Sequence, residues 1–160
     1  MVSYYEHKMK DRTYEFNLTS ITDQPFGGTK GAVRDFVWDD ITGNVAVGIF
    51  DYPKDEDAPA FNFEDVELTL TPLTPLIDGT EGKVIRGMCK IFTDGTAPGL
   101  SSVPIAEYRI TARWMPAGME PVPISVAGYG SDKYADSLVT AAFESAYGTE
   151  KRVAIRVGFP

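Results

Sequence analysis

Four basic residues on two predicted strands are the side chains best suited to binding chemistry. They alternate with apolar neighbours and so share the polar side of each strand. Cationic side chains gathered on one sheet face are typical of a surface that holds the phosphates of a nucleic acid. The alternative is that long basic side chains only keep an exposed sheet face soluble. The residues are Arg86 and Lys90 within 83–92, and Arg109 and Arg113 within 105–115.

Residues for covalent or metal chemistry are scarce. His7 is the single histidine and Cys89 the single cysteine, so a Ser–His–Asp triad, a Cys–His pair or an ordinary zinc site has too few members. Cys89 lies in a strand-like run and is expected to be a small buried hydrophobic residue. His7 lies in a charged N-terminal segment that we expect to be exposed or poorly ordered. We predict that the protein is not an enzyme and needs no metal or cofactor.

Acidic residues form two clusters that suggest, at first sight, a calcium site or a glycosidase pair. Their spacing does not match a calcium-binding EF-hand loop, and exposed acidic loops are usually only solvated. We therefore expect two solvated loops. The clusters are Asp35, Asp39 and Asp40, followed by Asp51, Asp55, Glu56 and Asp57.

Length and composition favour a single domain over 1–160. A hydrophobic fraction of 43% and a charged fraction of 24% exclude disordered and collagen-like chains. The net charge of -8 argues against a generic nucleic-acid coat of the histone kind but leaves room for a local basic face. Because the apolar runs are short and residues 1–20 carry many charges, we predict no signal peptide, no membrane span and no membrane partner.

Short runs rich in Val, Ile, Thr, Phe and Tyr, separated by Gly and Pro, predict a mainly β protein. Alternation is clearest over 64–71, where aliphatic residues face one way and polar residues the other. Three of these strands, 64–71, 83–92 and 105–115, have one apolar and one polar side. The expected strands are 12–19, 31–38, 44–51, 64–71, 83–92, 105–115 and 151–158, with loops at 23–31, 52–60 and 93–104.

One helix is predicted, beginning at Ser131 or Asp132 and ending at Gly148. A polar cap precedes it, and glycine is a common helix terminator. Residues such as Tyr134 and Leu138 lie at helical spacing and give the helix a wide apolar surface that needs a partner. The expected fold class is therefore α+β, mainly β, with an antiparallel sheet of about five to seven strands and this C-terminal helix.

Five segments follow one another in the order seen in a viral family. Gly27–Val33 reads Gly-Gly-Thr-Lys-Gly-Ala-Val, and Gly43–Val47 reads Gly-Asn-Val-Ala-Val. Val66–Thr71 reads Val-Glu-Leu-Thr-Leu-Thr, and Val103–Arg109 reads Val-Pro-Ile-Ala-Glu-Tyr-Arg. Together with Tyr129–Tyr147, these segments resemble the coat proteins of small single-stranded RNA bacteriophages, the levivirus-like family. The similarity is one of pattern.

This resemblance implies a viral coat protein. In that family the sheet of one subunit joins its partner's sheet in a dimer, the C-terminal helix packs on the neighbouring subunit, and dimers assemble into an icosahedral shell. The other side of the sheet binds single-stranded RNA. The implied partners are a second copy of the chain and single-stranded RNA, and the implied location is the virion, assembled in the cytoplasm of a bacterial host.

The family's RNA-binding pocket maps onto the polar sides of the predicted strands. Glu67 and Thr69 stand where the family has a Thr and a Ser, and Thr111 stands where it has a Tyr that stacks on a base. Stacking is worth about 1–3 kcal/mol per base, so a protein without that ring should bind the usual hairpin weakly or recognise a different RNA feature. The RNA-binding residues implied by the resemblance are Glu67, Thr69, Thr71, Arg86, Lys90, Arg109, Thr111 and Arg113.

Two other functions are compatible with the same residues. One is a decoration or tail protein of a double-stranded DNA phage, in which an acidic β-rich subunit is expected. The other is a ligand-binding β-sandwich that recognises carbohydrate through Trp38, Tyr52 or Trp114. Binding to a preformed shell would favour the first, and glycan binding by a monomer would favour the second.

Overall fold

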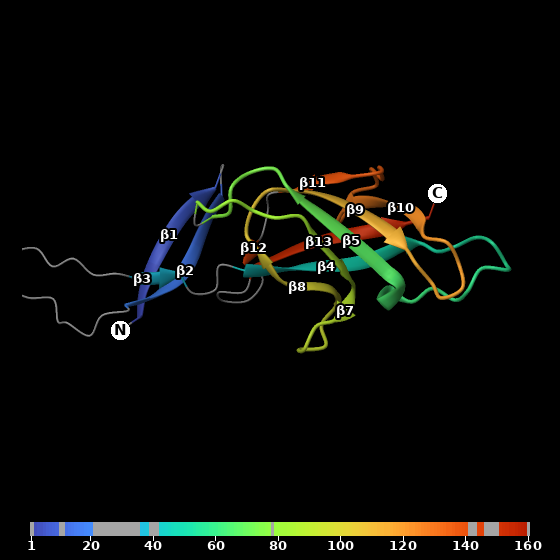
Figure 1. Cartoon of the computed structure of the whole chain (residues 1–160), viewed down its shortest axis with the longest axis horizontal. Helices are drawn as coiled ribbons and strands as arrows, with labels where there is room; N and C mark the ends of the chain where they lie inside the picture. Colours follow the sequence, from blue (N-terminus) through green and yellow to red (C-terminus); the bar gives the residue numbers. More distant parts are fainter. Residues whose placement is uncertain are drawn as a thin grey trace, which may run out of the picture.

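The computed structural model shows an all-β protein whose main unit is a nearly closed mixed barrel (Figure 1). The helical content of the part that the structure describes is one 3-10 turn, Phe63–Asp65. The structure describes residues 2–9, 12–20, 36–38, 42–77, 79–140, 144–145 and 151–159.

The barrel is built from one ten-stranded sheet. Its strands are β4 (Thr42–Asp51), β5 (Val66–Pro72), β6 (Ile85–Met88), β7 (Lys90–Ile91), β8 (Pro98–Pro104), β9 (Tyr108–Trp114), β10 (Val122–Gly128), β11 (Leu138–Thr140), β12 (Glu144–Ser145) and β13 (Lys151–Gly158). The main path runs β6–β5–β9–β10–β13–β4–β8–β7, with β11 beside β9 and β12 beside β13. The pair β4–β13 is parallel, whereas β5–β9, β9–β10 and β4–β8 are antiparallel.

One bent segment closes the barrel. β6 pairs with β5, and β7 pairs with β8 at the other end of the path. Cys89 lies at the bend, is fully buried, and donates its N–H to the carbonyl oxygen of Val66 at 2.8 Å. The strand predicted at 83–92 is thus divided between two neighbours. For this reason Ile91 is exposed, although the alternation predicts it on the same side as Cys89.

The interior of the barrel is the hydrophobic core. Along β5 and β9 every second residue is buried, and the residues between them face outward. β13 follows the same pattern, which confirms the strand predicted at 151–158. The apolar sides predicted for 64–71 and 105–115 are also confirmed. The buried residues on these three strands include Val66, Leu68, Leu70, Tyr108, Ile110, Ala112, Trp114, Val153, Ile155 and Val157.

Aromatic residues fill one end of the barrel. Trp114 and Phe159 meet edge to face with ring centroids 5.0 Å apart, and Phe61 contacts Phe159, Phe63 and Tyr52. The loop that follows β4 and the C-terminal strand β13 both reach this end (Figure 1). The loop predicted over 52–60 is confirmed, and these ring contacts hold it against the barrel.

The N-terminal strands form a separate sheet. β1 (Val2–Met9), β2 (Arg12–Ser20) and β3 (Phe36–Trp38) pair in that order. β2 confirms the strand predicted at 12–19. His7 lies in β1 opposite Tyr14 of β2. The loop predicted at 23–31 and the start of the strand predicted at 31–38 lie outside the described residues.

The predicted C-terminal helix is wrong wherever the structure describes the segment. Residues 131–134 form neither helix nor strand, Ala135 pairs with Val126 in an isolated bridge, and β11 follows. β11 pairs with β9, and Leu138 packs against the barrel core. Apolar side chains that a helix would have offered to a dimer partner are used within the chain's own barrel. The α+β class, with a helix packed on a partner, is therefore incorrect. Apart from β12, the rest of the segment lies outside the described residues.

The purely antiparallel sheet of about five to seven strands and the long turn over 93–104 are also wrong. The turn occupies only 93–97, and β8 begins at Pro98 because Leu100 and Val103 pack against the core. Proline is tolerated at the first residue of a strand, where its missing N–H breaks no ladder. The sheet has ten strands and is mixed, because β13 returns beside β4 in the same direction.

Candidate nucleic-acid interface

Three neighbouring strands bring most of the predicted RNA-binding residues onto one outer face of the barrel. Thr69 on β5 lies opposite both Arg86 on β6 and Thr111 on β9, so the outward residues of the three strands form rows. The residues between them point into the core, which fixes the direction of the rows. We call this surface the arginine face; it consists of Glu67, Thr69, Thr71, Arg86, Arg109, Thr111 and Arg113.

An ion-pair cluster holds part of the arginine face together. The Glu67 Oε1 atom accepts hydrogen bonds from Arg113 Nη2 at 2.5 Å and Arg113 Nε at 3.1 Å, and lies 4.0 Å from Arg86 Nε. The Glu67 side chain is 12% exposed, compared with 41% for Arg113 and 62% for Arg86. The carboxylate is thus covered, whereas both arginine side chains reach solvent.

The remaining members of the arginine face are hydroxyls and a further arginine. Arg109 is exposed and lies opposite Thr71, while the three threonines are partly exposed. Guanidinium and hydroxyl groups both donate hydrogen bonds to phosphate oxygens. Thr111 has no ring, and none of the seven residues is aromatic. The arginine face can therefore hold phosphates, but it offers no aromatic ring on which a base could stack.

Lys90 does not belong to the arginine face. It lies on β7 opposite Gly99 of β8, beyond the bend at Cys89, and is exposed there. The sequence pattern groups it with Arg86 because an uninterrupted strand would place residues four apart on one side. The bend removes that relationship.

Cys89 is the buried residue that the sequence predicts. Burial raises the pKa of its thiol to about 12, because a thiolate loses its solvation inside the barrel. A thiol that stays protonated is a poor nucleophile. Cys89 is thus a packing residue at the bend between β6 and β7.

Three members of the second acidic cluster lie in the exposed loop after β4, as predicted, whereas Asp51 is the last residue of β4 and is partly buried. Asp55, Glu56 and Asp57 are all exposed, and the Asp57 N–H donates to Asp55 Oδ1 at 3.0 Å. Within the described residues no group of three or more acidic, His or Cys side chains could hold a metal ion. The other cluster, Asp35, Asp39 and Asp40, lies outside the described residues.

The aromatic residues considered for carbohydrate binding do not form a platform. Trp114 is 2% exposed and packs in the barrel end, so it cannot contact a sugar. Tyr52 is 60% exposed, but its ring is engaged edge to face with Phe61. Trp38 lies on β3, in the separate N-terminal sheet.

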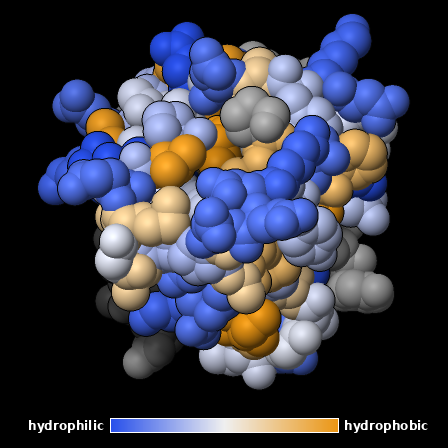
Figure 2. Space-filling model, turned by 90° about the vertical axis from the view of Figure 1, so that its right-hand side faces the viewer, coloured by the Kyte–Doolittle hydropathy of each residue, from blue (hydrophilic) through white to orange (hydrophobic). Residues whose placement is uncertain are grey.

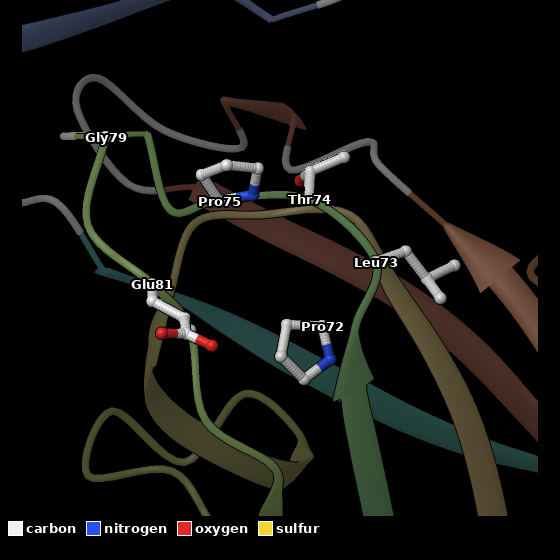
Figure 3. Close-up of a pocket in the computed structure, with 7 residues that line it drawn as sticks. Pro72, Leu73, Thr74, Pro75, Gly79 and Glu81 are labelled. Atoms are coloured by element: carbon white, nitrogen blue, oxygen red, sulfur yellow. The ribbon is translucent and has the colours of Figure 1, made fainter.

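A hollow of about 340 Å³ lies in the loop that follows β5 (Figure 3). The Glu81 carboxylate extends toward the Pro72 side of this hollow (Figure 3). Among the described residues that line it, Glu81 is the single ionisable one. The lining residues are Pro72, Leu73, Thr74, Pro75, Gly79, Glu81 and Gly82.

An aromatic–arginine cluster lies elsewhere on the barrel, and the sequence pattern gives little sign of it. It consists of Phe50 on β4, Arg156 on β13, and Tyr129 and Tyr134 after β10. The Arg156 guanidinium lies over the Tyr129 ring at 4.8 Å and over the Phe50 ring at 5.6 Å from each centroid. Phe50 stacks on Tyr134 at 5.7 Å. In the sequence, Tyr129 stands in a Gly-Tyr-Gly run that resembles the entry to a helix, which hides its role.

Exposed apolar side chains are distributed over many elements. In the view onto one end of the molecule, hydrophobic residues form separate patches among hydrophilic ones (Figure 2). Two of the most exposed, Tyr129 at 70% and Phe50 at 53%, belong to the aromatic–arginine cluster. Among the residues whose exposure the structure describes, the large exposed hydrophobic ones are Phe50, Tyr52, Leu73, Val84, Ile91, Met119, Tyr129 and Val139.

No family model, curated protein or solved structure matches the chain. Among the described residues, no helix has the length and apolar character needed to cross a membrane.

Proposed function

We propose that the protein is a non-enzymatic structural protein that binds single-stranded RNA through the arginine face. The observation that carries the proposal is the alignment of Arg86, Arg109 and Arg113 on the outer side of three paired strands. Three guanidinium groups and one carboxylate leave this surface positively charged. The negatively charged phosphates of a flexible single-stranded RNA are complementary to such a surface.

The position of Glu67 supports phosphate binding. Its carboxylate is covered and directs Arg113 through two N–H groups, so the remaining donors of that guanidinium stay available to a ligand. Arginine presents several donors in a fixed plane, which suits phosphate oxygens better than a mobile ammonium does. Glu67 thus acts as a positioning residue in this proposal.

The overall charge of -8 sets the expected strength of binding. A net negative protein repels a polyanion at long range, so attraction has to come from the arginine face at short range. Binding should accordingly be modest and strongly weakened by salt. For single strands, each phosphate contact adds about 0.7 to the slope of log K against log salt.

The test is fluorescence anisotropy of a labelled single-stranded RNA at several salt concentrations. Arg109→Ala should weaken binding and lower the salt slope by about 0.7. Lys54→Ala is the matched control, because Lys54 is exposed in the acidic loop rather than on the arginine face. No binding by the unmodified protein, or an equal loss in both variants, would contradict the proposal.

Assembly with further copies of the chain into a virion shell is the second part of the proposal. Because the structure has no helix in the described part of 131–148, this proposal does not include a helix-mediated dimer. Contacts between subunits have to come from the barrel surface. Val84 and Ile91, which are 58% and 56% exposed, lie just before β6 and within β7 and offer apolar area for such a contact. Size-exclusion chromatography and electron microscopy of the purified protein test this part. A monomer that forms no shells would exclude it while leaving RNA binding open.

A further inference from the structure

The aromatic–arginine cluster is a built surface rather than a chance contact. Arg156 lies over two rings, and one of these rings, Phe50, is stacked on Tyr134. A backbone hydrogen bond ties the main chain of Tyr129 to β13: the Tyr129 N–H donates to the Ala154 carbonyl oxygen at 3.1 Å. Gly158 leaves room for Tyr134, because a Cβ atom there would lie 3.1 Å from the ring. The three rings and the guanidinium therefore contact one another without a ligand.

The cluster nevertheless leaves two of its three rings open to solvent. Tyr129 is 70% exposed and Phe50 is 53% exposed. Arg156 adds a positive charge between exposed aromatic groups. Aromatic faces next to guanidinium groups bind planar, negatively charged ligands well, and nucleotides combine both properties.

The strand register places the cluster within reach of the arginine face. Arg156 pairs with Ala127 on β10, and Arg109 pairs with Val139 on β11. The bridge between Val126 and Ala135 joins β10 to the segment that leads into β11. Both arginines point outward, and in the main path of the sheet β10 alone lies between β9 and β13. At about 4.8 Å per strand spacing, β9 and β13 are roughly 10 Å apart at this level of the sheet.

We infer that the aromatic–arginine cluster stacks bases of the same single-stranded RNA whose phosphates contact the arginine face. This inference rests on the proposed function and adds the element that the arginine face lacks, since Thr111 and its neighbours have no ring. Tyr129 is the principal stacking residue, and Arg156 contacts the adjoining phosphate or base. Single-strand-binding OB-fold barrels cover about 4–16 nucleotides, and an RNA strand of that length is long enough to contact both surfaces.

The experiment compares stacking and charge variants on an oligouridylate of about 12 nucleotides. Tyr129→Ala should weaken binding at least about fivefold and leave the salt slope unchanged, because no charge is removed. Tyr129→Phe keeps the ring and should bind like the unmodified protein. Tyr52→Ala is the matched control, since Tyr52 is similarly exposed but lies outside the cluster.

A second readout reports stacking directly. Tyr129→Trp should show fluorescence quenching when the oligouridylate binds, whereas Tyr52→Trp should show none. This measurement also covers the case in which Tyr129→Ala fails to fold.

The outcomes separate the inference from the proposed function. If the RNA does not bind, both are overturned. If binding is salt-dependent and sensitive to Arg109→Ala, while Tyr129→Ala binds normally and Tyr129→Trp is not quenched, only the stacking inference is overturned. If Tyr129→Ala changes the oligomeric state but not RNA affinity, the cluster is a contact between subunits, and the inference is again wrong.

Discussion

Among the described glycines, Gly99 has the least room for a Cβ atom. It lies on β8 opposite Ala46, and a Cβ atom at this position would be 1.9 Å from the carbonyl oxygen of Val45. The obstacle is backbone, which cannot move aside as a flexible side chain can. Any larger residue would have to separate β4 from β8.

Gly99→Ala should therefore lower the free energy of unfolding by more than about 1 kcal/mol. Gly128→Ala is the matched control, because a Cβ atom there meets no atom within 4 Å and its φ is not positive. That control should be neutral or slightly stabilising. Urea unfolding followed by circular dichroism measures both, and equal stability of the two variants would contradict the close approach.

Cys89 should resist thiol reagents in the native protein. Its pKa is raised to about 12 by burial, so the thiolate is scarce at neutral pH. A chromogenic disulfide reagent should find no reactive thiol in the folded protein at pH 8 and one after denaturation. Rapid labelling of the native protein would show that the bend between β6 and β7 opens readily.

The same shift predicts a loss of stability in alkali. The pKa of Cys89 is higher in the folded state than in the unfolded state, where it is near 9. The contribution of the buried thiol to the free energy of unfolding is complete below the unfolded-state pKa. It declines as the pH rises from that pKa toward 12. Cys89→Ser, which introduces a polar group into the buried site, is unsuitable as a control. Cys89→Ala removes the titration and should flatten this part of the stability profile.

At the scale of elements, the turn between β7 and β8 is held by Asp94. Its Oδ1 atom accepts hydrogen bonds from the Thr96 N–H at 2.9 Å and the Thr96 hydroxyl at 2.7 Å. Arg152 on β13 donates to the Thr96 hydroxyl oxygen at 3.1 Å and lies 3.8 Å from Asp94 Oδ2. The turn is thereby tied to a strand far away in the sequence.

These bonds lower the pKa of Asp94 below its usual 3.8, the Thr96 hydrogen bonds first and the charge of Arg152 after them. The stabilisation of the turn by these interactions is fully present above the ordinary pKa of an aspartate. It is lost as the pH falls through the lowered pKa of Asp94. An NMR titration of the carboxyl carbon should show the lowered midpoint. Thr96→Val removes the hydroxyl bond and should raise it. An unchanged midpoint in that variant would show that the hydroxyl bond is not formed in solution.

A strand can be predicted from the sequence when neighbouring residues determine it, but not when pairing with a distant segment determines it. On β5 the alternation of Leu68 and Thr69 reveals both the buried side and the arginine face, because side-chain direction follows from strand geometry alone. For Leu138 the neighbouring residues permit a helix, and only pairing with the distant β9 selects a strand. Lys90 is misplaced for a similar reason, since the bend at Cys89 is set by two partners, β5 and β8, that the pattern does not contain.

At the scale of the whole molecule, β13 holds the centre of the barrel. It lies between β10 and β4, pairs with both, and contributes three buried aliphatic residues. Deletion of residues 151–160 should therefore abolish cooperative thermal unfolding, because two strand edges and the core would be exposed. Differential scanning calorimetry and circular dichroism test this expectation.

Removal of residues 1–41 is the contrasting deletion. The N-terminal sheet pairs within itself, so the remaining barrel should fold and unfold within a few degrees of the full chain. A large loss of stability would mean that the N-terminal sheet packs on the barrel in solution. Normal unfolding after deletion of 151–160 would contradict the central position of β13.

The barrel is closed by two ladders, β5–β6 and β7–β8. Both are short, because β6 has four residues and β7 has two. Separation of these two ladders would open the barrel into a curved sheet and leave the other ladders of the main path intact. Arg86 lies on β6, two strands from Arg109 on β9. A polyanion bound to both arginines would span the β5–β6 ladder and hold these two strands together. Binding of the polyanion would therefore oppose opening of the barrel, and opening of the barrel would weaken binding.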